Sequence, residues 1–148
     1  MAMNRRSAIV VALLVFAVNA HPLAAAETPA QRIGSKLKRA EYFSAWAHGD
    51  AAIPTENEMT FRVFMQQKPA VDDALRLIAD GTLAGKVYGF LALKELSPEL
   101  LAKLAPRFYG NRRDGVSIWS GCSPSSEPLG KLVKMIADGK IVLRKQRE

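Results

Sequence analysis

Cys122 is the only cysteine in this 148-residue chain, and His48 is one of two histidines. A thiol becomes a nucleophile when a neighbouring base removes its proton, so Cys122, His48 and a carboxylate would be the components of a thiol enzyme or redox protein. The sequence places no base next to Cys122, and a small residue packed beneath a loop explains a single cysteine more simply. We therefore predict no catalytic residue, and we keep a Cys122-centred thiol enzyme or redox protein as an alternative.

Other kinds of site lack their characteristic residues. So few histidines and cysteines cannot form a transition-metal cluster within one subunit. The segment Gly81–Gly85 lacks the lysine and the preceding strand of a phosphate-binding loop, and no G-x-S-x-G motif is present. Carboxylate pairs such as Asp72 and Asp73 lie where helix ends favour negative charge, so a glycan hydrolase is only a minor alternative. We expect no metal, no cofactor and no enzymatic activity.

The most distinctive stretch for binding is the connection over residues 107–128, which is rich in glycine, proline and serine. Connections of this length in a compact domain are commonly functional or disordered. It carries Trp119 together with Arg112 and Arg113, and an exposed aromatic ring flanked by arginines is typical of an interface. A buried Trp119 would instead pin the connection to the core, and both alternatives stay open. The candidate binding residues are Tyr109, Arg112, Arg113, Trp119 and Cys122.

The elements that must position these side chains are mostly helices, because apolar residues recur at intervals of three or four. Thr55 precedes a helix in which Glu58 can reach back in a capping box, and this helix, apolar on most sides, is expected at the centre of the core. The predicted helices cover residues 30–47, 55–65, 71–80, 83–96 and 98–105. Ser126 and Pro128 are predicted to start a last helix, which Gly139 stops.

Three details refine this prediction. Gly85 and Gly89 lie one turn apart within a predicted helix, where each costs about 1 kcal/mol relative to alanine, so a neighbouring helix should approach closely there.

Val116–Trp119 is predicted as a short strand that pairs with the tail at Ile141–Leu143. The stretches Leu77–Gly81 and Met135–Gly139 are nearly alike, which a shared way of ending a helix explains more simply than an internal repeat.

The N-terminal residues have the pattern of an export signal. Arg5 and Arg6 precede the apolar run Ala8–Val18, and Ala24–Ala26 supplies the small residues that a signal peptidase accepts. Eleven apolar residues cover about 16 Å of helix, roughly half of a bilayer core, so a membrane anchor is disfavoured. We expect residues 1–26 to be a signal peptide cleaved after Ala26, and residues 27–148 to form one domain in the periplasm or outside the cell, without stable membrane insertion.

Charge and cysteine count then narrow the class of partner. The formal charge of +7 falls to +5 on cleavage, because two of the 21 basic residues and none of the 14 acidic ones lie in the leader. An exported chain rarely meets nucleic acid, so we expect none as a partner; the charge would serve an acidic protein, an anionic polymer or lipid, or solubility alone. One cysteine permits no internal disulfide, but it permits a homodimer linked through Cys122, and an apolar helix face is the other route to a dimer.

The run from Gly85 to Glu99 resembles one unit of a HEAT-like repeat, with small residues at a tight helix crossing followed by a short turn and a second helix. Together with Gly121-Cys122 and Ser126–Leu129, it also resembles a group of exported bacterial proteins of unassigned function. The resemblance covers about residues 71–136. It implies an α-hairpin fold and transfers no catalytic residue.

The sequence thus predicts a mainly α protein: a small single-domain bundle of about six helices in α-hairpins, with a HEAT-like arrangement as one form, a long irregular loop at about 107–128 and one short β pair. The expected function is non-enzymatic binding of an envelope or secreted protein through that loop. One specific version is an immunity or inhibitor protein that blocks an envelope toxin or hydrolase.

Overall fold

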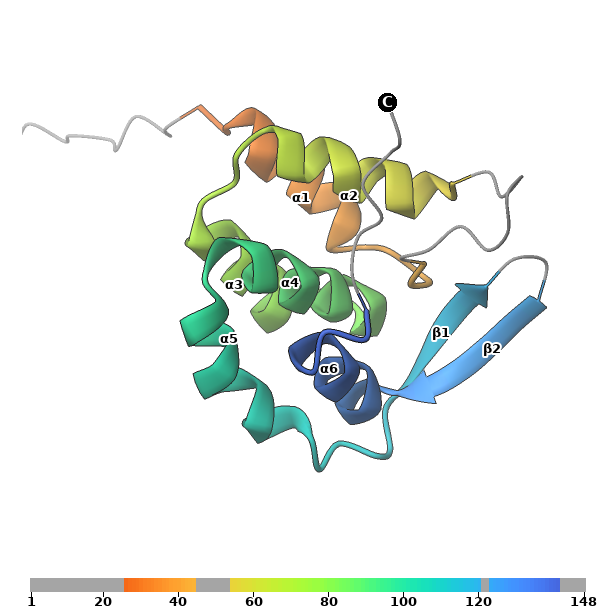
Figure 1. Cartoon of the computed structure of the whole chain (residues 1–148). Coiled ribbons are helices and arrows are strands. Elements are labelled where there is room, and N and C mark those ends of the chain that lie inside the picture. The colour runs from red at the N-terminus through yellow and green to blue at the C-terminus, as the bar shows by residue number, and fades with distance from the viewer. Residues whose placement is uncertain (1–25, 45–53, 121–122, 142–148) are drawn as a thin grey trace, which may run out of the picture.

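The computed structural model describes residues 26–44, 54–120 and 123–141. Within these ranges the chain forms a mainly helical small domain, with six α-helices in packed pairs and one antiparallel β pair (Figure 1). The elements in chain order are α1 (Pro29–Leu37), α2 (Glu56–Gln66), α3 (Val71–Asp80), α4 (Leu83–Leu96), α5 (Pro98–Leu104), the 3-10 helix η1 (Ala105–Phe108), β1 (Gly115–Ser120), β2 (Ser123–Pro128) and α6 (Leu129–Ala137). None of the described helices combines the length and the hydropathy needed to cross a bilayer.

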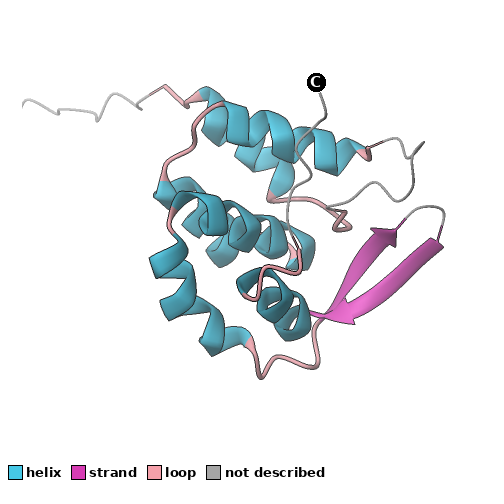
Figure 2. Cartoon of the chain, viewed as in Figure 1, coloured by secondary structure: helices cyan, strands magenta, loops and turns pink. Residues whose placement is uncertain are grey.

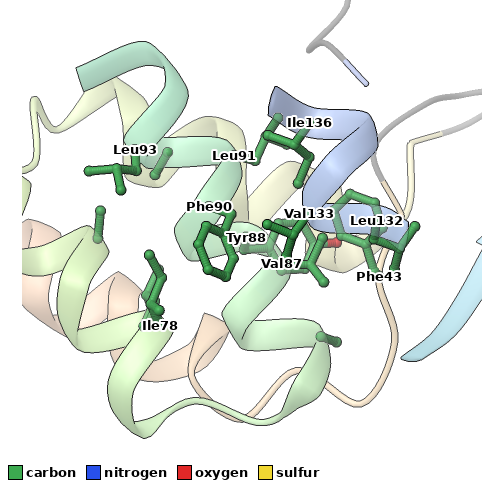
Figure 3. Close-up of a cluster of buried hydrophobic side chains, with 14 of the residues drawn as sticks. Phe43, Ile78, Val87, Tyr88, Phe90, Leu91, Leu93, Leu132, Val133 and Ile136 are labelled. Carbon is green, nitrogen blue, oxygen red and sulfur yellow. The ribbon is translucent and has the colours of Figure 1, made fainter. Parts of the chain in front are cut away.

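Helix α4 is the centre of the core. It lies between α3 and α6, and Figure 3 shows its side chains meeting Ile78 of α3 on one side and Leu132 and Ile136 of α6 on another. A helix enclosed in this way must be apolar all round, and α4 buries residues on every face, among them Tyr88 and Phe90.

The prediction that the helix after Thr55 occupies the centre is therefore wrong. Helix α2 lies at the surface, where Met59 is 45% exposed and Val63 is 38% exposed. Thr55 caps α2 as predicted, since its hydroxyl accepts from Glu58 N–H at 3.2 Å. The Glu58 side chain does not return to Thr55; it pairs with Arg62 one turn later, with 2.6 Å between Oε1 and Nη2.

The two glycines of α4 confirm the predicted close approach. A Cβ at Gly89 would lie 2.7 Å from Ile78 Cγ1 and 2.9 Å from Ala74 O, so no larger residue fits while α3 stays in place. A Cβ at Gly85 would lie 2.8 Å from Leu37 O at the end of α1. The loss of helix propensity at both glycines is offset by close packing against α1 and α3.

The first helix ends ten residues earlier than predicted. Helix α1 stops at Leu37, and the carbonyl of Lys38 accepts from Thr82 N–H at 2.9 Å. The carbonyl of Ala40 accepts from the Thr82 hydroxyl. In a continuing helix the carbonyls of Lys38 and Ala40 would accept from N–H groups four residues later. Thr82, just before α4, donates to both carbonyls instead, so α1 does not continue for another turn. Tyr42 and Phe43 consequently leave the helix; Trp46 lies outside the described residues.

The two similar helix endings are not alike in three dimensions. Gly81 follows α3 in an extended conformation, with φ −75° and ψ 161°. Gly139 lies two residues beyond α6 with φ +75°, the left-handed region that glycine adopts without strain. The two helices therefore do not end in the same way, and that prediction is wrong. The similar residues instead belong to two helices that both pack against α4.

Candidate functional site

The connection predicted as an irregular loop contains a β-hairpin. Strand β1 pairs with β2 in antiparallel register, with Gly115 opposite Pro128 and Ser120 opposite Ser123. The predicted pairing of β1 with the tail is wrong, because β2 takes that place; residues 142 and 143 lie outside the described range. Figure 2 shows the two strands beside the helices, at one side of the molecule.

Alternation along β1 separates a buried face from an exposed one. Val116 and Ile118 are buried in the core, whereas Ser117 and Trp119 point to the opposite side. Trp119 is 44% exposed, which makes it one of three exposed large hydrophobic residues in the described part of the chain. This settles the alternative left open by its sequence: Trp119 does not anchor the connection to the core.

The extended segment at Phe43 adds a third strand position beside β1. Phe43 N–H donates to Ser117 O at 2.8 Å, and Trp119 N–H donates to Phe43 O at 2.9 Å, which is a parallel bridge. The Phe43 ring is fully buried against Tyr88 of α4, with 5.0 Å between ring centroids. The backbone of Trp119 is thus connected through Phe43 to the centre of the core.

Tyr88 of α4 binds the backbone of Ser44, the residue after Phe43. Its hydroxyl accepts from Ser44 N–H and donates to Ser44 O, both at 3.0 Å. Burial raises the pKa of the Tyr88 hydroxyl far above its usual range, so it remains a neutral donor.

Tyr42 completes the exposed side of this arrangement. Its ring contacts Trp119 with 5.6 Å between centroids and 38° between planes, and Pro124 lies directly opposite Trp119 on β2. Asn57 of α2 donates to Tyr42 O at 2.9 Å and holds this backbone in place. We call Tyr42, Trp119 and Pro124 the aromatic face; it crosses three adjacent extended segments on the solvent side.

A hollow of about 410 Å³ adjoins the aromatic face. Helix α1 and the residues after it contribute Lys36, Arg39, Glu41 and Tyr42 to its lining, and α2 contributes Glu56, Asn57 and Thr60. Tyr42 therefore belongs both to the hollow and to the aromatic face. A bound chain could place one side chain in the hollow and another over Trp119.

The free edge of β2 is poorly suited to pairing with another strand. Leu129 N–H donates to Asp114 O at 2.9 Å. Because hydrogen-bonded and non-hydrogen-bonded pairs alternate along an antiparallel pair of strands, the N–H groups of Ser123, Ser125 and Glu127 also point toward β1. The outward positions are Pro124, Ser126 and Pro128, and proline has no N–H to donate. Binding at this hairpin must therefore rely on side chains.

The predicted site residues do not gather in one place. Arg112 and Arg113 are exposed in the turn before β1, where Asn111 and Asp114 bind one another at 2.6 Å between Nδ2 and Oδ2. Trp119 lies near the other end of β1, and the four residues from Gly115 span about 13 Å. The arginines therefore do not flank the Trp119 ring.

Tyr109 is the other predicted site residue that the structure describes, and it lies elsewhere. Tyr109 is half-buried under the ammonium group of Lys134, which lies 5.5 Å from the ring centroid, so its role here is in packing. Cys122 and His48 lie outside the described residues. Sequence reasoning missed Tyr42, because the apolar period continued through it and favoured a helix.

A second hollow, of about 350 Å³, lies between α1 and α3. Its lining includes Lys38 and Asp80, which pair at 3.3 Å with both side chains substantially exposed, and Arg76. Three carboxylates, Glu27, Asp73 and Asp80, line this hollow beside the two cations. None of the described lining residues is aromatic, so the hollow offers fewer features for recognition than the aromatic face.

Comparisons with family models, with curated proteins and with solved structures find no match for this chain. The class that the fold and the site define is a small helical domain with a β-hairpin that presents an exposed aromatic face.

Proposed function

We propose that this protein is a non-enzymatic binding protein that docks a protein partner on the aromatic face. The supporting observation is that Trp119 is 44% exposed although its backbone is fixed by β2 and by Phe43. A large ring held rigidly at the surface loses little conformational entropy when a partner covers it, which is why tryptophan dominates binding energies at interfaces.

The surroundings of Trp119 suit such a role. Its neighbours on the exposed face of the hairpin are small: Ser117 beside it on β1, and Pro124 and Ser126 across from it on β2. A flat surface of small side chains allows close approach, and the prolines direct the partner to the face of the sheet and away from its edge. If the leader acts as predicted, the partner is an envelope or secreted protein.

Replacement of the Trp119 ring tests this proposal. Proteins captured from the cell envelope by the wild-type chain would be identified and purified, and their affinities measured for wild type and for Trp119→Ala. We expect the substitution to weaken binding by at least about 10-fold, because a central tryptophan is typical of residues that contribute more than 1 kcal/mol to an interface.

Met59→Ala is the matched control. Met59 is 45% exposed, about the same as Trp119, but it lies on α2 and does not line the hollow. We expect its removal to leave affinity within about 2-fold. Equal effects of the two substitutions, or an unchanged affinity for Trp119→Ala, would refute a docking surface centred on Trp119.

A further inference from the structure

We propose that the partner segment that covers the aromatic face is an acidic peptide segment, whose carboxylates continue over the hollow and along the exposed side of α1. This inference rests on the proposed function and specifies its partner. It is carried by a row of cations, Arg32, Lys36 and Arg39, which form no ion pair with any residue that the structure describes; we call them the basic stripe.

The basic stripe follows from helical periodicity. Its members are separated by four and three residues, so Arg32 and Lys36 share one side of α1, and Arg39 continues that side just past the helix end. The seven residues span about 10 Å at about 1.5 Å per residue. All three side chains are exposed, and no ion pair reaches them from the described residues; Arg39 makes one hydrogen bond, from Nε to Ser35 O at 3.2 Å.

The stripe and the aromatic face are continuous. Lys36, Arg39 and Tyr42 line the same hollow, and the Tyr42 ring contacts Trp119. A single extended chain can therefore run from α1 across the hollow to the hairpin without leaving the surface. The free N–H of the Asn57 amide and the hydroxyl of Thr60 provide hydrogen-bonding groups along this path.

Two carboxylates line the same hollow and must be counted. Glu56 is the first residue of α2, where the positive end of the helix dipole offsets part of its charge. Glu41 is the other carboxylate, and the cations that line the hollow beside it are Lys36 and Arg39; Arg32 lies farther along α1. Along the whole path the three cations of the basic stripe face these two carboxylates, so the path carries one net positive charge, and the helix dipole at Glu56 adds to this excess.

The shape of this surface favours a peptide over other anions. Trp119 and Pro124 offer an apolar contact at one end, the hollow accepts a side chain, and the cations lie in one row. An acidic segment that ends in a large apolar residue satisfies all three features. A phosphate polymer would use the cations alone.

The test uses a synthetic peptide as the probe. A fluorescein-labelled peptide of about eight residues, four carboxylates followed by leucine and tryptophan, spans about 25 Å when extended. Its binding to the protein would be followed by fluorescence anisotropy, beside a peptide with the same carboxylates changed to amides. We expect the amide peptide to bind at least about 10-fold more weakly, and the difference to shrink at high salt.

Matched charge variants locate the binding surface. The double variant Lys36→Ala with Arg39→Ala should weaken binding of the acidic peptide about 5-fold or more. Lys103→Ala with Arg107→Ala removes the same charge from exposed residues of α5 and η1, and it should have little effect. Equal losses for the two double variants, or no binding of the peptide, would overturn the inference.

Competition distinguishes the kind of anion. Polyphosphate that displaces the peptide as well from Trp119→Ala as from the wild type would show a general anion surface and would refute peptide recognition. Vesicles of phosphatidylglycerol that bind more tightly than the peptide would do the same. If Trp119→Ala abolishes binding of the captured partner but the α1 variants do not, the proposed function stands and this inference fails.

Discussion

Among individual residues, Glu58 and Arg62 carry the largest unresolved electrostatic cost. The Glu58 side chain is 1% exposed and the Arg62 side chain is 17% exposed, yet they share one hydrogen bond. Glu58 Oε2 and Arg62 Nε are buried, and neither atom has a hydrogen-bond partner among the described residues. A buried ion pair with unsatisfied atoms contributes little net stability. Removing one partner is nevertheless destabilising, because the other charge is then buried without an opposite charge beside it. The sequence places both residues on one helix four positions apart; only the structure shows that they are buried.

We therefore predict opposite results for single and double substitution. Arg62→Ala should lower the free energy of unfolding by about 3 kcal/mol, because it leaves the Glu58 carboxylate buried and unpaired. Glu58→Leu combined with Arg62→Leu should lie within about 1 kcal/mol of the wild type. Urea unfolding measures both.

The exposed pair Glu127–Lys131, joined at 2.8 Å, provides the comparison, since removing either partner should cost less than about 1 kcal/mol. A double apolar variant as unstable as Arg62→Ala would contradict this account.

At the scale of elements, the packing of α3 against α4 depends on one position. Helix propensity favours alanine over glycine by about 1 kcal/mol, so propensity alone predicts that replacing Gly89 stabilises α4. The neighbouring atoms are the backbone of α3 and the Ile78 side chain, which cannot give way as the end of a flexible side chain would. Packing should therefore outweigh propensity.

We predict that Gly89→Ala lowers the free energy of unfolding by about 2 kcal/mol, because α3 must shift to admit the methyl group. Gly34→Ala in α1 is the control: its Cβ would meet Phe64 at 3.4 Å, an ordinary contact, so the substitution should be neutral or slightly stabilising. Thermal unfolding of the two variants separates these cases. A stabilised Gly89→Ala would show that α3 and α4 are not packed as described.

At the scale of the whole molecule, Tyr88 connects the central helix to the segment that supports the hairpin. Its hydroxyl binds both backbone groups of Ser44, and its ring packs on Phe43, which bridges to β1. The aromatic face is therefore supported from the core through Phe43. Loss of the Tyr88 hydroxyl should affect global stability and, to a smaller extent, the order of the segment around Tyr42.

We predict that Tyr88→Phe costs about 1–3 kcal/mol at neutral pH, because two buried backbone groups of Ser44 lose their partner. The pH dependence follows from the raised pKa of folded Tyr88. Above about pH 10 the unfolded chain loses a proton that folded Tyr88 keeps, so the wild type loses stability as pH rises.

In Tyr88→Phe this decline should be shallower, and chemical unfolding between pH 8 and pH 11 would measure it. Parallel curves for wild type and variant would refute the role of Tyr88 in alkaline stability.

Most of the local structure follows from signals along the chain. Capping residues, helix-ending glycines and apolar periods located α3, α4 and α5 closely, because those signals act within a few residues along the chain. The last helix begins later than predicted, at Leu129, because Ser126 and Pro128 belong to β2. The glycines of α4 predicted a close helix crossing, since a cost in propensity implied a compensating contact. The leader, the exported location and the absence of enzymatic activity remain predictions.

The location of the candidate site depends on long-range contacts. Tyr42 continued the apolar period of α1, but Thr82 took the carbonyls that another helical turn would have used, and the chain became extended beside β1. That contact joins residues more than forty positions apart, so no local pattern predicts it. As a result, Lys36 and Arg39 line the same hollow as Tyr42, whereas Arg112 and Arg113 precede β1, at the end away from Trp119. The physical reason is that long-range backbone hydrogen bonds determine which surfaces become neighbours.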